Sequence, residues 1–369
     1  MKILLISNMY PSSENDSYGV FVKNFVESMR NAGAEFSGIC VIKGKKTGKL
    51  RKMVAYIKFF MKIVFNVIFR STDIVYIHYP LQTAPILRLL RMFTARPFVL
   101  NFHGSDLFYS EKVSRFIKKQ SEKLAREAEL IVVPSEYFKR ELSDKLKVDK
   151  NKIIVSPSAG LNFDVFNRNG LESAEKRKYF AGFISRIDTE KGWDTFLEAL
   201  KVLKDNNQLS EKKYLLLGSG KEDDKKNRLI KELDLEDLVD VAGSVPQNEL
   251  PDFFKSMELF VFPSERKAES LGLVGLEAMA CGIPVLGADN GGIADYINDG
   301  QNGLLFKKGD ENDLAQKICK FREMTKIQRM SIEEKAYETA TLYENSRVSR
   351  SLVEKIRKRF LPGEANGKV

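Results

Sequence analysis

Two glutamates, Glu269 and Glu277, stand eight residues apart around the expected start of a helix. The apolar run 259–262 predicts a strand, residues 263–270 a loop, and residues 271–281 a helix. The first backbone N–H groups of a helix have no partner inside it, so phosphate oxygens can bind there. A phosphorylated ligand that is rich in hydroxyl groups would find donors and carboxylate acceptors together at this place.

The expected donors are the backbone N–H groups of Ser270, Leu271 and Gly272, and Gly272 has no side chain that would block a ligand. Both carboxylates also have an ordinary explanation. Glu269 would stabilise the helix dipole, and Glu277 would pair with a nearby cation. The neighbouring motifs decide between the two explanations.

Arg186 and Lys191 form a cationic pair in the segment 180–192. A strand is expected to end at the arginine, and a helix to begin after the Lys-Gly pair. Such side chains can converge on one anion, because arginine offers a planar fork and lysine a point charge. A phosphorylated group that departs with growing negative charge would need that help. The alternative is that both are solvated surface cations, as most Lys and Arg residues are.

His103 follows a buried strand and opens the sequence His-Gly-Ser-Asp106. Open α/β sheets bind ligands at the carboxyl ends of their strands, so His103 is a candidate for contacting a ligand. The ordinary alternative is a structural histidine. Asp106 is expected to cap the following turn. The other histidine of the chain, His78, also ends a strand, and we expect it to be a supporting or acceptor-side residue.

The glutamate motif resembles the signature of family 4 of the retaining glycosyltransferases, in which a Glu, seven residues and a second Glu bind a nucleotide-sugar donor. The cationic motif is similar to the family's second signature, and the resemblance extends over nearly the whole chain. It implies that Glu269 meets the donor sugar and that Glu277 holds the ribose. Ser270 and Leu271 stand where the family usually has Gly and Phe, a departure that leaves the backbone donors in place.

The resemblance also implies roles for residues elsewhere in the chain. The cationic pair would stabilise the leaving diphosphate, and His103 would lie beside the donor sugar with Gly104 allowing a close approach. Gly19, in the loop after the first strand, would bring its N–H to the donor phosphates, and the backbone near Val245 would meet the base. No enzymic nucleophile is implied, because attack from the leaving-group face needs none.

Strand-like and helix-like segments alternate along the chain, which implies an α/β fold with helices on both faces of parallel sheets. Strands are expected near 2–7, 36–42, 74–79, 98–103, 130–134, 153–156, 178–184, 213–218, 239–242, 259–262, 284–287 and 303–306. The resemblance implies the GT-B fold, in which two doubly wound, Rossmann-like domains face each other across a cleft.

The periodicity lapses between 158 and 178, where Gly and Asn residues cluster, so we expect a domain boundary there. Residues 1–165 would form an N-terminal, acceptor-side domain and residues 175–344 a nucleotide-sugar donor domain. The resemblance implies that a final helix, 345–362, packs back on the first domain. A length of 369 residues suits two domains better than one core.

Cys40, Cys281 and Cys319 cannot all pair with one another and show no metal-ligand spacing, so we expect a reducing compartment. The first apolar run is too short for a signal peptide. A cytoplasmic protein is therefore predicted, with a peripheral position on the inner face of the cytoplasmic membrane as an option. No Gly-x-Gly-x-x-Gly follows the first strand, which disfavours a dehydrogenase. We expect no metal and no cofactor, since GT-B enzymes neutralise the leaving group with Arg, Lys and helix ends.

Positive charge is concentrated in the first half: residues 1–170 carry 28 Lys and Arg against 15 Asp and Glu, a net +13, and the rest is −3. The stretch 43–70 has nine Lys and Arg and no acidic residue. On a helix, this stretch has a narrow polar stripe formed by Arg51, Ala55, Lys58, Lys62 and Asn66. The wide apolar arc beside it contains Tyr56, Phe59, Phe60, Met61, Phe65 and Phe69.

Two explanations of this helix remain open. It could bind an anionic membrane surface, where a lipid-linked acceptor would be found, or it could be a core helix with cations on its solvent side. Lys58 and Lys62 interrupt it too early for a spanning helix, which needs about 20 apolar residues. Nucleic-acid binding is disfavoured, because the aromatic residues do not alternate with cations as a stacking platform would.

The sequence thus favours a retaining hexosyltransferase that moves a sugar from a nucleoside-diphosphate donor to a hydroxyl of a glycan or lipid-linked glycan, in cell-surface polysaccharide synthesis. Another GT-B enzyme, such as a phosphorylase or a nucleotide-sugar epimerase, would share the fold. A catalytically silent glycan-binding relative would bind no nucleotide. The sugar, the base (UDP, GDP or ADP) and the acceptor depend on angstrom-scale placement that motifs do not encode.

Overall fold

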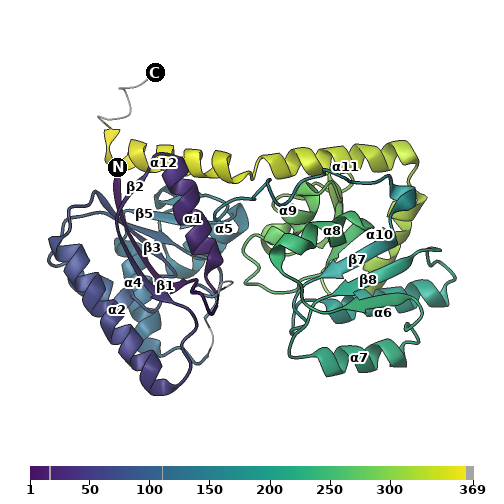
Figure 1. Ribbon diagram of the computed structural model, residues 1–369, viewed down its shortest axis with the longest axis horizontal. Coiled ribbons are helices and arrows are strands. Elements are labelled where there is room, and N and C mark those ends of the chain that lie inside the picture. The colour runs from purple at the N-terminus through teal and green to yellow at the C-terminus, as the bar shows by residue number, and fades with distance from the viewer. Residues whose placement is uncertain (16–17, 110, 363–369) are drawn as a thin grey trace. The chain divides into compact units, whose positions relative to one another are not determined.

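The computed structural model describes residues 1–15, 18–109 and 111–362. The chain forms two compact units: unit 1 comprises Met1–Gly160 and Asn345–Val369, and unit 2 comprises Leu161–Glu344. Each unit is built on one six-stranded sheet with helices against it (Figure 1). All neighbouring strands in both sheets are parallel.

Unit 1 has the strand order β2-β1-β3-β4-β5-β6. Its strands are β1 (Lys2–Tyr10), β2 (Glu35–Lys43), β3 (Ile74–His78), β4 (Phe98–Asn101), β5 (Leu130–Val133) and β6 (Ile153–Val155). Its helices are α1 (Val20–Asn31), α2 (Lys49–Phe69), α3 (Ala84–Leu90), α4 (Arg115–Glu127), α5 (Glu136–Leu146), the short η1 (Lys150–Lys152) and α12 (Asn345–Phe360). The order reverses between β1 and β3, and ligands bind at such a switch point in open α/β sheets.

Helices cover both faces of the unit 1 sheet. Leu4 and Ile6 of β1 lie in a hydrophobic cluster with residues of α2, α3, α4 and α5. Ile3 and Leu5 point to the other face and join a cluster with α1 and α12. Because successive side chains of a strand alternate between faces, a strand buried on both sides reads as the unbroken apolar run seen in the sequence.

Unit 2 has the strand order β12-β11-β10-β7-β8-β9. Its strands are β7 (Tyr179–Ile184), β8 (Lys213–Leu217), β9 (Val239–Ala242), β10 (Met257–Phe262), β11 (Val285–Ala288) and β12 (Gly303–Phe306). Its helices are η2 (Ala174–Lys176), α6 (Trp193–Asp205), α7 (Asp223–Glu232), η3 (Gln247–Glu249), α8 (Leu250–Lys255), α9 (Leu273–Ala280), η4 (Gly291–Ile293), α10 (Glu311–Glu323) and α11 (Lys326–Thr341). Here the switch point lies between β7 and β10.

The boundary between the units differs slightly from the expected domain limits of 165 and 175. Leu161 and Phe166 are buried in the hydrophobic core of unit 2, so the division falls after Gly160. The Leu161 N–H donates to the carbonyl oxygen of Tyr343 at 2.7 Å. The chain therefore enters and leaves unit 2 at adjacent points. Each of the twelve expected strands corresponds to an observed strand, with ends that differ by a few residues.

Helix α12 belongs to unit 1, although it follows unit 2 in the sequence. Leu352 and Ile356 are buried in the same cluster as Phe25 and Met29 of α1. This side of the unit 1 core therefore depends on a segment from the end of the chain.

We expect Leu352→Ala to destabilise unit 1 by roughly 2–5 kcal/mol, because it removes a fully buried leucine from this cluster. Lys358→Ala, at an exposed position of the same helix, is the control and should change the unfolding free energy by less than about 0.5 kcal/mol. Urea unfolding followed by circular dichroism measures both. Equal effects of the two variants would show that α12 does not contribute to the core.

Candidate functional site

Two loops of unit 2 begin at its switch point. The loop after β7, residues 185–192, carries Arg186 and Lys191, and the loop after β10, residues 263–272, carries Glu269. Strands β7 and β10 are parallel neighbours, so both loops leave the sheet at the same edge. The topology explains how residues far apart in the sequence can meet.

Lys191 and Glu269 form an ion pair in which Nζ lies 2.8 Å from Oε2, and their side chains are only 11% and 16% exposed. The hydroxyl of Ser264 donates to the same carboxylate oxygen at 3.1 Å. Charges sheltered from water in this way interact more strongly than a surface pair does. The structure therefore brings two of the predicted site residues together, and it adds Ser264, which the sequence analysis did not identify.

Gly192 allows the two loops to approach each other. It has a left-handed conformation, φ +76°, and caps the start of α6. A Cβ atom at this position would lie 2.1 Å from the carbonyl oxygen of Pro263, at the start of the second loop. Only glycine tolerates both the conformation and the close contact. This contact sets the neighbouring Lys191 beside the loop that carries Glu269.

A pair of glycines that the sequence analysis missed holds the backbone of Glu269. The Gly292 N–H donates to the carbonyl oxygen of Glu269 at 3.0 Å. A Cβ atom on Gly291 would lie 2.7 Å from the same oxygen. The sequence signal was present, since two consecutive glycines shortly after a strand often mark a close backbone contact.

Helix α9 begins later than expected, at Leu273, with Gly272 as its cap. The N–H groups of its first turn that a phosphate could use therefore belong to Leu273 and Val274. Ser270 and Leu271, which were expected in the first helical turn, lie in the preceding loop.

Backbone conformation and packing explain why residue 272 is a glycine. Gly272 adopts φ +78°, a left-handed conformation. An added Cβ atom would lie 2.7 Å from Phe262 Cε1 and 3.0 Å from Ile293 Cγ1. The turn and the packing therefore require glycine here, whereas the sequence analysis assigned it to ligand access.

Glu277 lies inside α9 and is buried. The side-chain amide of Gln247 donates to its Oε1 at 3.0 Å. Burial raises the pKa of Glu277 to about 7, and the hydrogen bond from Gln247 offsets part of this shift. Gln247 follows Val245 by two residues, and Val245 packs against the same hydrophobic core as α9. The residue predicted at the ribose and the one predicted near the base thus belong to one neighbourhood.

Arg186 differs from Lys191 in its surroundings. Its side chain is 66% exposed, and its guanidinium lies 3.0 Å from Asp188 Oδ2. The sequence analysis expected both cations to converge on one anion. In the structure, Lys191 is held by Glu269, and Arg186 is held by an acidic residue of its own loop.

In unit 1, His78 is the last residue of β3 and His103 follows the neighbouring strand β4, and their side chains meet. His78 Nδ1 lies 2.8 Å from His103 Nε2, and the rings are stacked with centroids 5.0 Å apart. Tyr79 also stacks on His103, at 4.6 Å. Burial lowers the pKa of both histidines, that of His103 to about 3. Both imidazoles are therefore neutral near pH 7, and one donates a hydrogen bond to the other.

Asp106 holds the turn that follows this pair. Its Oδ1 accepts hydrogen bonds from the backbone N–H groups of His103 and Gly104, both at 2.9 Å. It is buried, and burial raises its pKa to about 6. Asp106 thus caps the turn, as the sequence predicted, and the N–H of Gly104 is already engaged.

Gly19 lies at the unit 1 switch point, after β1. It adopts φ +76° and caps α1, and an added Cβ atom would lie 2.7 Å from the backbone nitrogen of Tyr10. The conformation and the contact both require glycine. Its predicted role at the donor phosphates stays a prediction, and residues 16 and 17 of the same loop lie outside the described part of the chain.

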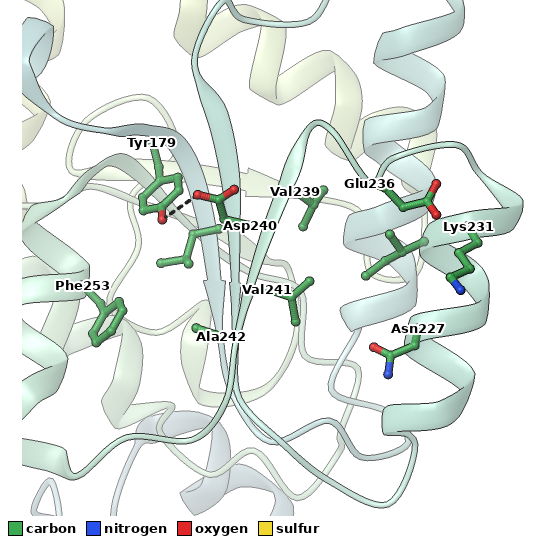
Figure 2. Close-up of a pocket in the computed structure, with 11 residues that line it drawn as sticks. Tyr179, Asn227, Lys231, Glu236, Val239, Asp240, Val241, Ala242 and Phe253 are labelled. Carbon is green, nitrogen blue, oxygen red and sulfur yellow. Dashed lines mark hydrogen bonds between the residues drawn. The ribbon is translucent and has the colours of Figure 1, made fainter.

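A hollow of about 630 Å³ opens beside the edge strand β9 of unit 2. Figure 2 shows Tyr179 and Asp240 on one side, joined by a hydrogen bond of 3.0 Å, and Lys231 and Glu236 on the other. Within the described residues, its lining includes none of the predicted site residues. The hollow and the predicted site at the switch point are therefore two different places on unit 2.

The described residues contain no group of three or more His, Cys, Asp or Glu side chains that could hold a metal ion. Among the same residues, none of the helices combines the length and the hydrophobicity needed to cross a bilayer. Cys40, Cys281 and Cys319 are buried and unbridged.

Two doubly wound parallel sheets of this kind define the GT-B class of glycosyltransferases. HepE of Anabaena, solved in complex with UDP, has a TM-score of 0.76 at 18% identity, over 97% of this chain and 100% of that one. Sucrose-phosphate synthase of Thermosynechococcus elongatus has a TM-score of 0.76 at 19% identity, over 98% of this chain and 100% of that one. These likenesses show that the fold is GT-B.

The sequence places the chain within this class. Residues 166–339 match the family "Glycosyl transferases group 1", and residues 20–159 match "Glycosyltransferase Family 4". The chain belongs to the family 4, group 1 glycosyltransferases.

Relatives bear glycosyltransferase names as well. An uncharacterized glycosyltransferase of Methanocaldococcus jannaschii is 29% identical over 249 residues, which are 67% of this chain and 64% of that protein. TuaC of Bacillus subtilis, named for teichuronic acid biosynthesis, is 24% identical over 384 residues, covering 92% of this chain and 93% of TuaC. WcaL of Escherichia coli, named for colanic acid biosynthesis, is 26% identical over 60% of this chain and 54% of WcaL.

The raised pKa of Glu277 predicts a pH dependence of stability. The native state holds the proton more tightly than the unfolded state between pH 4.5 and about 7, so stability falls as the pH rises through this window. Glu277→Gln keeps a hydrogen-bonding group beside Gln247 but cannot ionise. We expect equal stabilities near pH 4.5 and a variant more stable than the wild type by up to ~3 kcal/mol at pH 8. Chemical unfolding across this range measures the difference, and a constant difference would contradict the assignment.

Proposed function

We propose that this protein is a retaining glycosyltransferase that moves a hexosyl group from a nucleoside-diphosphate sugar to a hydroxyl of a glycan or lipid-linked glycan. The observation that carries the proposal is the sheltered Lys191–Glu269 pair at the unit 2 switch point. Family membership supports the reaction type. The solved complex of HepE with UDP supports a nucleoside-diphosphate donor.

The leaving diphosphate sets the main electrostatic task, because negative charge grows on it in the transition state. Lys191 and Arg186 would supply cations, and the first turns of α6 and α9 would supply backbone N–H groups. Without a ligand, Lys191 is neutralised by Glu269. A bound diphosphate would give Lys191 a second anion, and this would leave Glu269 able to accept hydrogen bonds from sugar hydroxyls.

The remaining assignments follow the same chemistry. Glu277, once ionised, would accept hydrogen bonds from the ribose hydroxyls, and the backbone near Val245 would meet the base. His103 is neutral near pH 7, so it suits hydrogen bonding to a sugar hydroxyl and not charge stabilisation. No protein nucleophile is assigned. The acceptor would attack from the leaving-group face and pass its proton to a phosphate oxygen.

The names of TuaC and WcaL support a place in cell-surface polysaccharide synthesis. The three buried, unbridged cysteines suit a cytoplasmic setting. We assign no metal and no further cofactor, because Arg186, Lys191 and helix ends suffice to neutralise a diphosphate.

Transfer from a labelled donor tests the proposal. UDP-, GDP- and ADP-sugars are first screened for thermal stabilisation, since a ligand at about 100 times its dissociation constant adds ~2.7 kcal/mol. The stabilising donor is then incubated with candidate acceptors in EDTA, and the anomeric configuration of the product is read by NMR. We expect retention of configuration. Inversion would refute the retaining mechanism, and dependence on an added divalent ion would refute the metal-free assignment.

Lys191→Met should lower turnover at saturating donor roughly 100- to 1,000-fold, because the leaving diphosphate loses a preorganised cation. Lys308→Met, at an exposed position of unit 2, is the matched control and should leave turnover unchanged. Initial rates and thermal melts of both variants separate a catalytic loss from unfolding. Near wild-type turnover of Lys191→Met would contradict the assigned role.

A further inference from the structure

Helix α2 has two apolar sides, and only one of them packs on unit 1. Phe59, Ile63 and Val67 are buried against the sheet. Lys62 Nζ donates to the carbonyl oxygen of Ile39 in β2 at 2.7 Å, and Arg70 donates to that of Ser37. These contacts fix the rotation of the helix about its axis. Its other side therefore stays turned away from the core.

The outward side of α2 is an apolar stripe. It consists of Leu50, Val54, Ile57, Met61, Phe65 and Ile68, at the three- and four-residue spacing of one helix face. Met61 is 59% exposed and Phe65 is 61% exposed. A shallow hollow of about 440 Å³ with a wholly apolar lining lies along this side. Figure 1 shows α2 beside the sheet of unit 1 with no other helix of that unit over it.

The count of exposed residues shows that the stripe is unusual within this protein. Among the described residues, eight exposed large hydrophobic side chains lie on α2, whereas all of unit 2 has four. Apolar surface concentrated in this way on one face marks an interaction site.

Positive charge borders the stripe. Lys45, Lys46, Lys49, Arg51 and Lys52 are all exposed, and none of them forms an ion pair with any described residue. Unit 1 contains 34 Lys and Arg against 16 Asp and Glu, a net +18, and unit 2 contains 26 against 34, a net −8. The partner of the stripe must therefore be apolar in its interior and anionic at its surface.

We propose that α2 binds the surface of an anionic lipid bilayer. The helix lies in the plane of the interface, with its apolar stripe at the boundary between headgroups and acyl chains. The basic segment 43–52 contacts lipid phosphates. Lys58 is exposed beside the stripe, so the helix binds at the surface and does not insert across the bilayer.

A bilayer fits better than other occupants of the stripe. A second copy of the chain would bring the same basic segment to the interface, and like charges would repel. A nucleic acid would satisfy the cations but not the aliphatic side chains of the stripe. The lipid assignment concerns α2 alone and does not rest on the proposed reaction, although a lipid-linked acceptor would be found at such a surface.

Vesicle flotation tests the proposal on the full-length chain, with vesicles of phosphatidylcholine alone or with one-third phosphatidylglycerol. We expect the wild type to float with the anionic vesicles and binding to weaken at high salt. Two variants should bind at least about tenfold more weakly: Met61→Gln with Phe65→Gln, and Lys45→Glu with Lys46→Glu and Lys49→Glu.

The controls are matched in number and exposure and lie on unit 2. They are Ile327→Gln with Met330→Gln, and Lys308→Glu with Lys320→Glu and Lys335→Glu, and both should bind as the wild type does. Thermal melting is measured for every variant, alone and with the donor that the UDP-, GDP- and ADP-sugar screen selects, so a loss of lipid binding is separated from misfolding and from failure of donor binding. Absence of wild-type flotation, or equal losses in variants and controls, overturns the proposal. A wild-type dimer that Phe65→Gln converts to a monomer, without lipid binding, overturns it in favour of a second copy.

Discussion

The close contact between Gly192 and the carbonyl group of Pro263 is the constraint on which the unit 2 site depends. A side chain at position 192 would lie 2.1 Å from that oxygen, so the loops after β7 and β10 can come together only with glycine there. Lys191 is the residue before this contact, and Glu269 lies in the loop that Pro263 begins. Their ion pair therefore follows from backbone packing. The Ser264 hydroxyl further fixes the carboxylate of Glu269, and the Gly292 N–H fixes its backbone carbonyl oxygen. The backbone sets the position of the cation before any ligand arrives, which is what electrostatic preorganisation requires.

The switch point of unit 1 carries neutral histidines in place of an ion pair. His103 carries no charge near pH 7, because burial lowers its pKa to about 3. The ring beside it belongs to His78, which burial also keeps neutral. Asp106 holds the backbone of the turn by accepting hydrogen bonds from the N–H groups of His103 and Gly104. One switch point thus offers a fixed pair of charges and the other offers neutral hydrogen-bonding groups.

The sequence was sufficient for the α/β fold class and for the strands, because strands buried on both faces, such as 74–78 and 130–133, read as apolar runs. It also placed Lys191, Glu269, Glu277 and His103 correctly relative to strands and helices, because that spacing can be read from the sequence, and their assigned roles stay predictions. The role of Gly272 was not visible, since its reason is packing against Phe262, which belongs to another element. The partner of Arg186 and the support from Gly292 depend on loop conformation in the same way. The periodicity of apolar residues locates helices and strands in a sequence, whereas contacts between loops can be seen only in the three-dimensional structure.

Helix α2 is a second case in which the sequence alone could not decide between two structures. Its composition predicts an amphipathic helix, but composition could not decide whether the apolar arc packs inside the protein or faces outward. The structure divides the arc: Phe59 is buried, whereas Phe65 is exposed. This division explains why the sequence of α2 was compatible both with a core helix and with a helix that binds a membrane surface. The surplus of positive charge in unit 1 fits the proposed contact of α2 with lipid. Unit 2 is acidic as a whole, and under the proposed function it would hold an anionic donor with a few placed cations. A diffuse positive field on unit 1 is of little use for binding one diphosphate, but it is suited to an extended anionic surface.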